Sequence, residues 1–442
     1  SELCGECGRL MVVGDDAQSI YSFRGANIAN ILNLNRTYKN LRIFKLEENY
    51  RSTQTIINAA NSLIDKNEGQ IPKKVFSRND KGDRIELVQA YSDYEEGFLV
   101  ANRVAQVKLT RHDSYDDFAI LYRTNSQSRI LEEALRKQSI PYRIYGGQSF
   151  YQRKEVKDAV SYFRLTVNPD DDEALRRVIN VPARGIGDTT LAKLTRAAID
   201  NGVSLWHVIT HLDTIDTGLN NGTRRKLQGF RELLEKFIDS RSTADAAALA
   251  QLIISETGMI SQLQGDRTPE SISRIENLQE LVNGARQFVK MHTEEGNEDI
   301  GMEYFLSEVS LATDQDKNDD DDSAKVTLMT VHAAKGLEFA NVFIVGVEED
   351  LFPNSMSAAN AEEIEEERRL LYVAITRAKR FCMISYASSR FRNGRTAMCS
   401  PSGFIRDLAP RYLKPVTGPT VTCPALFTPA ERHPAPSQSP VD

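Results

Sequence analysis

The sequence has 442 residues, which predicts two to four domains at ~100–200 residues each. Its 40% hydrophobic and 26% charged residues are ordinary for a globular protein. No run approaches the ~18 apolar residues of a membrane span, so we expect a cytoplasmic protein with no membrane partner. The formal net charge of −7 argues against a DNA-coating polycation but allows DNA binding through local basic patches.

The first 150 residues alternate strand-like and helix-like segments, which predicts a parallel α/β sheet. We expect strands at 10–14, 42–47, 84–89, 118–123 and 142–145. We expect helices at 53–66, 95–109 and 127–138.

From about residue 153 to 313 the sequence changes to long amphipathic stretches without a convincing strand, which predicts a helical domain. Its clearest helices are expected at 189–200, 224–238, 244–256 and 271–290. The acidic segment 314–322, with six aspartates, is interpreted as a solvated loop rather than a metal site.

The α/β pattern then resumes, with strands expected at 326–331, 341–345 and 381–385 and a helix at 362–378. The simplest architecture is therefore an α/β domain interrupted by a helical insertion. Residues 415–442 hold seven of the 15 prolines and are predicted to form a disordered tail.

Several polar segments follow predicted strands, where ligands of open α/β sheets bind. Gln18 is placed to sense a phosphate, and Tyr21, Phe23 and Arg24 could stack on bases, although a turn with core aromatics fits this segment equally. Arg51 could reach a phosphate or form a structural ion pair.

Three further segments are weak signals when each is taken alone. Gly336 would let the backbone approach a ligand. The acids-then-bases order of residues 365–380 is typical of a solvated helix face. Glycines at 185 and 187 before a helix could expose N–H groups to a phosphate or simply form a turn.

Together these segments resemble motifs of the UvrD/PcrA/Rep-type superfamily 1 DNA helicases. The similar segments, in the family's order, are residues 14–26, 49–53, 119–129, 326–352 and 366–379. The resemblance extends from residue 10 to about residue 413. It implies ATP-driven 3′→5′ translocation on single-stranded DNA and unwinding of the duplex at a junction, with two RecA-like domains enclosing ATP.

The resemblance also implies a domain organisation. Residues 1–48 would be the end of the first RecA-like domain, and 49–152 with 323–414 would be the second. Residues 153–322 would be the helical insertion, followed by the tail at 415–442. Repair or replication proteins are the expected protein partners.

For ATP, the resemblance assigns Gln18 to sensing the γ-phosphate and Tyr50 to stacking near adenine. Arg51 and Arg377 would be arginine fingers, and Glu338 would meet the ribose. The cleft linking ATP to DNA would be lined by His332, Lys335 and Gly336.

For DNA, the family pattern implies strand contacts by Tyr21, Phe23, Arg24, Arg123 and Asn125, with Phe23 where the family usually has tryptophan. Residues 122–157 carry eight Lys/Arg against three Glu, and the difference, 8 − 3, is +5, which suits phosphate binding. Duplex contacts are implied for Gly185, Ile186, Gly187, Thr189 and Thr190.

No P-loop (Gly-x-x-x-x-Gly-Lys-Ser/Thr) occurs in these 442 residues. The Mg²⁺ ligands of the family are expected before residue 14, and no metal ligand is assigned here. We therefore predict a C-terminal helicase part that hydrolyses no ATP alone; the alternative is a non-enzymatic DNA-binding or regulatory module. The Cys4/Cys7 pair lacks a second ligand pair, which argues against zinc.

Overall fold

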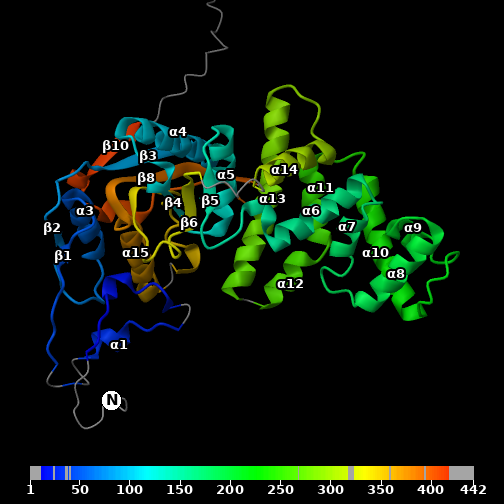
Figure 1. Ribbon diagram of the computed structural model, residues 1–442, viewed down its shortest axis with the longest axis horizontal. Coiled ribbons are helices and arrows are strands. Elements are labelled where there is room, and N and C mark those ends of the chain that lie inside the picture. Colours follow the sequence, from blue (N-terminus) through cyan, green and yellow to red (C-terminus); the bar gives the residue numbers. More distant parts are fainter. Residues whose placement is uncertain are drawn as a thin grey trace, which may run out of the picture.

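The computed structural model describes residues 11–22, 25–34, 38, 41–266, 268–316, 323–357, 360–392 and 395–417. Figure 1 shows two regions, a sheet covered by helices and a group of helices that extends to one side of it.

The sheet has eight strands. Seven follow the order β10-β3-β8-β7-β4-β6-β5 in parallel, and β9 pairs antiparallel with β8. The strands are β3 (Ile85–Ser92), β4 (Phe118–Tyr122), β5 (Tyr142–Ile144), β6 (Val326–Thr330), β7 (Phe339–Ile344), β8 (Ala378–Arg392), β9 (Arg395–Met398) and β10 (Leu413–Thr417). The predicted fold class, an α/β RecA-like parallel sheet interrupted by an all-helical insertion, is confirmed.

Helices cover both faces of the sheet, so its central strands are buried throughout. Along β4, Phe118, Ile120 and Tyr122 pack on the face with α4 and α5, while Ala119 and Leu121 pack on the face with α3 and α15. The helices of this region are α3 (Gln54–Ile64), α4 (Asp93–Arg111), α5 (Ser128–Lys137), α15 (Ala361–Ile375) and α16 (Gly403–Asp407).

The segment before α3 contains only short elements. They are the 3-10 helix η2 (Asp16–Gln18), α1 (Ala29–Leu32) and β1 (Glu48–Asn49), which pairs in parallel with β2 (Phe76–Ser77). The strands predicted at 10–14 and 42–47 are wrong, because residues 11–14 and 42–47 form none. A strand needs a hydrogen-bonded neighbour, and no described strand pairs with these segments, whose Val13 and Phe44 are 76% and 83% exposed.

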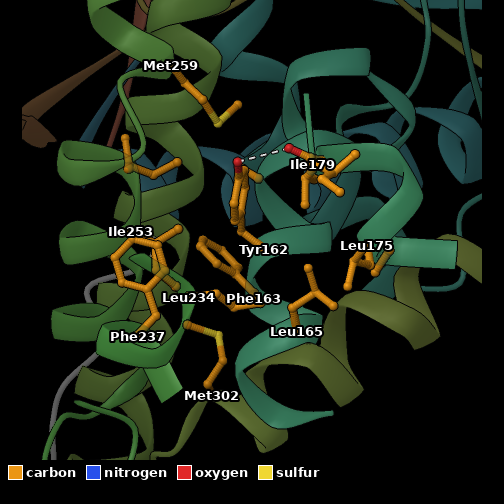
Figure 2. Packing of buried hydrophobic residues seen from close by; sticks show 14 of the residues in the cluster. Tyr162, Phe163, Leu165, Leu175, Ile179, Leu234, Phe237, Ile253, Met259 and Met302 are labelled. Carbon is orange, nitrogen blue, oxygen red and sulfur yellow. Dashed lines mark hydrogen bonds between the residues drawn. The ribbon is translucent and has the colours of Figure 1, made fainter. Parts of the chain in front are cut away.

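The insertion consists of nine described helices around one core (Figure 1). They are α6 (Lys154–Val167), α7 (Asp172–Val178), α8 (Asp188–Asn201), α9 (Leu205–Thr210), α10 (Asn221–Ser240), α11 (Ala246–Glu256), α12 (Met259–Asp266), α13 (Pro269–Glu294) and α14 (Met302–Asp316). Figure 2 shows Tyr162 and Phe163 of α6 among side chains of α7, α10, α11, α12 and α14. The hydroxyl of Tyr162 donates to the carbonyl of Val178 (3.1 Å), so this buried polar atom is satisfied.

Two predicted boundaries need correction. Helix α14 continues to Asp316, so the acidic loop predicted at 314–322 begins later, and residues 317–322 lie outside the described residues. Strand β10 includes residues 415–417, so the predicted tail cannot start at 415. Proline is tolerated at Pro415 because β10 is an edge strand, which is hydrogen-bonded on one side only. Residues 418–442 lie outside the described part. None of the described helices is long and apolar enough to cross a membrane.

Candidate nucleotide and DNA site

A turn after β1 brings Arg51 to the edge of the sheet where β7 and β8 begin. The Oδ1 of Asn49 accepts hydrogen bonds from the backbone N–H groups of Arg51 (3.0 Å) and Ser52 (2.9 Å). The hydroxyl of Ser52 then donates to the carbonyl of Ala378, the first residue of β8 (2.6 Å). These bonds hold Arg51 against Glu338, which immediately precedes β7.

Glu338 is shared by two cations. The Nε of Arg51 donates to one carboxylate oxygen, and the Nζ of Lys379 lies 2.8 Å from the other. Hydrogen bonds from Lys379 and Arg51 lower the pKa of Glu338 to about 2, so the carboxylate is charged at neutral pH. The side chains of Lys379 and Glu338 are 41% and 42% exposed, so a nucleotide can reach them from solvent.

Arg377, the residue before β8, is buried at 2% exposure. Its guanidinium donates to the carbonyls of Val373 and Leu337 (both 3.1 Å) and to the hydroxyl of Thr376 (3.3 Å). Burial, and secondarily the nearby Arg51, lower the pKa of Arg377 to about 10, so it stays protonated at neutral pH. These hydrogen bonds go to neutral groups, and a buried cation held in this way favours an approaching anion.

Lys335 links this edge to the N-terminal segment. Its Nζ donates to the carbonyl of Gln18 (2.9 Å) and lies 4.8 Å from the centre of the Tyr21 ring. The hydroxyl of Tyr21 donates to the carbonyl of His332 (3.1 Å). Gly336 follows with a φ of +92°, which favours glycine. The structure therefore brings together the residues that the sequence assigns to the cleft between ATP and DNA.

The side chain of Gln18 bonds within its own turn, because its Nε2 donates to the Oδ2 of Asp15 (2.5 Å). Lys73 binds both Asp15 and Asp16, the latter at 2.8 Å. Burial acts to lower the pKa of Lys73, but the bonds to the two carboxylates outweigh it and raise that pKa. The turn before Gln18 is therefore fixed by a cation that the sequence does not single out.

Tyr50 is the predicted base-stacking residue of the ATP site. The side chain of Tyr50 is 79% exposed, so a base could lie on its ring. Phe23 and Arg24 lie outside the described residues.

Arg123 and Asn125, both predicted to contact single-stranded DNA, have different surroundings. The guanidinium of Arg123 makes three hydrogen bonds to the carboxylate of Glu367 (2.6, 3.0 and 3.1 Å). Asn125 is exposed, its carbonyl accepts from Arg153 (2.9 Å), and its amide donates to Ser273 (3.4 Å). The structure thus places Asn125 at the surface and commits Arg123 to an ion pair.

The basic stretch at 122–157 is less positive at the surface than its sequence indicates. Arg129 is buried and pairs with Glu280 of α13 (2.6 Å) and with Glu133 (3.2 Å). Arg153 is also buried and donates both to Asn277 of α13 (2.9 Å) and to Ser128 of α5 (2.6 Å). These arginines attach the insertion to the sheet region, so their charges are not available to a DNA strand.

The segment predicted to contact duplex DNA forms the loop that starts α8. The Oδ1 of Asn180 accepts from the backbone N–H groups of Arg184 (2.8 Å) and Ile186 (3.2 Å), which fixes the loop from inside. Ile186 is buried, whereas Gly185 and Gly187 are exposed. Exposed or half-buried hydroxyls follow at Thr189 and Thr190. The buried Ile186 therefore anchors the loop, while its backbone at Gly185 and Gly187 is open to solvent.

The described residues suit a polyphosphate better than a metal ion. Arg51 and Lys379 pair with the one carboxylate of Glu338 at the edge of β7 and β8, and the buried Arg377 lies beside them, which leaves positive charge for phosphate oxygens. Within the described residues no group of three or more His, Cys, Asp or Glu could hold a metal ion. Cys4 and Cys7 lie outside them.

Lys379 and Glu367 are the functional neighbours that sequence reasoning missed. Both belong to residues 365–380, whose charge order we interpreted as a solvated face. The only sequence signal for Lys379 was its position two residues after Arg377, between the predicted helix at 362–378 and the predicted strand at 381–385. Nothing in the local pattern could indicate that Glu367 pairs with a residue 244 positions away.

Comparison with known proteins agrees with this arrangement. The UvrD-like helicase C-terminal domain family matches residues 44–389, and the UvrD/REP helicase N-terminal domain family matches residues 1–39. The ATP-dependent DNA helicase PcrA of Leuconostoc citreum is 40% identical over 92% of this chain and 54% of its own length. PcrA of Bacillus subtilis is 40% identical, over 90% of the chain and 54% of the relative. DNA helicase II of Escherichia coli is 41% identical, over 92% and 56%.

The chain thus spans about half the length of the curated relatives it matches. The match to the C-terminal family covers most of the chain and includes Arg51, Glu338 and Arg377. The chain belongs to the UvrD-like helicase family.

Proposed function

We propose that this chain is the C-terminal part of an ATP-dependent 3′→5′ DNA helicase, which translocates on single-stranded DNA and unwinds duplex at a junction. The observation that carries the proposal is the sharing of one carboxylate, Glu338, by the cations Arg51 and Lys379 beside the buried Arg377. Three positive charges against one negative charge suit a nucleotide triphosphate.

In this proposal Arg51 and Arg377 neutralise charge that develops on the γ-phosphate. Glu338 releases Arg51 and turns to the ribose, and Tyr50 stacks near adenine. Gln18 senses the phosphate and transmits its presence through Lys335 and Tyr21, whose contacts support such a route. Mg²⁺ would complete the site with ligands that the family resemblance places before residue 14.

The domain division proposed is 1–48, 49–152 with 323–417, and 153–322 for the insertion. Single-stranded DNA and a single-strand/duplex junction are the proposed substrates, with the loop at Gly185–Thr190 on the duplex and Asn125 on the strand. A role in DNA repair or replication, with partner proteins from those processes, is part of the same proposal.

The printed sequence has no P-loop, so this chain alone should not hydrolyse ATP even when single-stranded DNA is added. ATPase assays of the purified 442-residue chain test this directly. Robust turnover that is abolished by Arg377→Ala would contradict it.

A chimaera tests the proposed activity. The part of the Bacillus subtilis relative that this chain does not cover is placed before this chain, and DNA-stimulated ATP turnover is measured. Arg51→Ala and Arg377→Ala should each abolish turnover. Arg196→Ala removes an exposed arginine that pairs with Asp200 (2.8 Å) within α8, outside the sheet region, and it should leave turnover unchanged. A folded chimaera that binds DNA but never hydrolyses ATP would favour a non-enzymatic DNA-binding module instead.

A further inference from the structure

A lysine of α10 lies over the loop that starts α8. The Nζ of Lys226 donates to the carbonyl of Gly185 at 3.2 Å, although the two residues are 41 positions apart. A Cβ on Gly185 would lie 2.5 Å from that Nζ and 3.5 Å from the Cε of the same lysine. Because real Cβ atoms essentially never approach this closely, a side chain at position 185 would displace the lysine ammonium.

The two glycines of the loop therefore have different roles. Gly185 has a φ of +70°, which favours glycine, and its missing side chain makes room for Lys226. Gly187 has a φ of −89°, and a Cβ there would meet nothing within 4 Å. A substitution at Gly187 should be tolerated, whereas one at Gly185 should move the lysine.

Lys226 presents its ammonium at the protein surface. Its side chain is exposed, and among the described residues it has no carboxylate within ion-pair distance. The first turn of α10 contains no acidic residue, and the neighbouring Arg225 is exposed as well. Asp188, in the first turn of α8, is the nearest acidic residue along the loop sequence. An ammonium held only by a neutral carbonyl at the surface is available to an external anion.

We propose that Lys226 is a DNA-phosphate ligand of the helical insertion, held in position by the absence of a side chain at Gly185. The inference rests on the proposed function, in which the loop at Gly185–Thr190 meets the duplex. It adds a contact from α10 that the loop sequence does not contain. A lysine ammonium binds a backbone phosphate as a point charge, so the contact should be independent of base sequence.

The test uses the full 442-residue chain and a fluorescein-labelled junction of single-stranded and duplex DNA. Fluorescence anisotropy gives the binding constant from about 50 to about 200 mM salt. Lys226→Met should reduce the steepness of log K against log salt by ~0.9, the value for one duplex phosphate, which is about 3.5-fold less change in affinity over that range. Binding to single-stranded DNA alone should be unchanged.

Gly185→Ala should reproduce the slope of Lys226→Met, and the double variant should show no further reduction. Lys236→Met is the matched control and should keep the parental slope. Lys236 is also an exposed lysine of α10, ten residues after Lys226, and its ammonium is already paired with Glu256 at 3.1 Å.

The possible failures can be told apart. If the parent chain does not bind the junction, the proposed function is overturned. If the parent binds but Lys226→Met keeps its slope, the assignment of Lys226 is overturned while the proposed function stands. If the effects of Gly185→Ala and Lys226→Met on the slope add, the glycine acts through its backbone and does not position the lysine.

Discussion

Replacing Arg123 with alanine would leave the carboxylate of Glu367 without its cation partner. The two side chains are 18% and 7% exposed, and three hydrogen bonds of 2.6 to 3.1 Å join them. Removing one partner of a buried ion pair costs about 3–5 kcal/mol, because the remaining charge is left uncompensated. Since Arg123 is partly reached by solvent, we expect the free energy of unfolding to fall by an amount near the lower limit, ~3 kcal/mol.

Urea unfolding of Arg123→Ala, Glu367→Ala and the double variant measures this pair. The coupling free energy from the double-mutant cycle should exceed ~1 kcal/mol. Arg143→Ala is the control, because Arg143 is 51% exposed and lies 3.8 Å from Asp116. It should change the free energy of unfolding by less than ~1 kcal/mol.

DNA binding by the same variant distinguishes the structural role from the role implied by the family pattern. A lost contact to a single-strand phosphate would reduce the steepness of log K against log salt by ~0.7. Because the guanidinium of Arg123 is held by Glu367, we expect the parental slope. A variant of parental stability with a slope reduced by ~0.7 would refute the reasoning.

The remaining predictions concern other charged groups. Arg377→Met should leave the free energy of unfolding within ~1 kcal/mol of the parent in urea titrations, because it replaces a buried cation that is bonded to neutral groups; a loss above ~3 kcal/mol would contradict this. The Glu338 carboxyl should titrate near pH 2 by NMR, and Lys379→Met or Arg51→Met should move the midpoint toward 4.5. Since the folded pKa is the lower one, these contacts should stabilise the fold above about pH 4.5 and cease to do so as the pH falls through about 2. Arg390 of β8 is buried and pairs with the buried carboxylates of Glu96 and Glu348. Arg390→Met should lower the free energy of unfolding by about 3–5 kcal/mol in urea titrations, because both carboxylates lose their shared cation; an unchanged urea midpoint would contradict this.

Local sequence patterns predicted many of the helices and most strands, because both patterns depend on neighbouring residues, although helices such as α6 and α14 had no predicted range. The buried run at 118–122 and the amphipathic stretch at 224–238 are found where they were expected. The segments 11–14 and 42–47 carry an equally good strand pattern but have no strand beside them. Pairing is not a local property, so the pattern alone could not show its absence.

The candidate site likewise has features that the sequence could predict and features that depend on contacts between distant segments. Motif order predicted that Arg51, Glu338 and Arg377 would come close together, and they lie at one edge of the sheet. It could not predict which side chains bind one another. The pairing of Arg123 with Glu367 and the placement of Lys226 over Gly185 depend on how separate helices pack.

The strand order has a consequence for how this chain acquires its fold. Strands β3, β4 and β5 precede the insertion, yet each pairs only with β6, β7, β8 or β10, which follow it. Ala119, for example, is paired with Thr327. During synthesis the first half of this sheet can therefore form no internal strand pair, and its apolar strands must wait until the insertion has been translated. Contacts of such long sequence separation form slowly, so the early strands are the part of the chain most exposed to misfolding and to binding by chaperones.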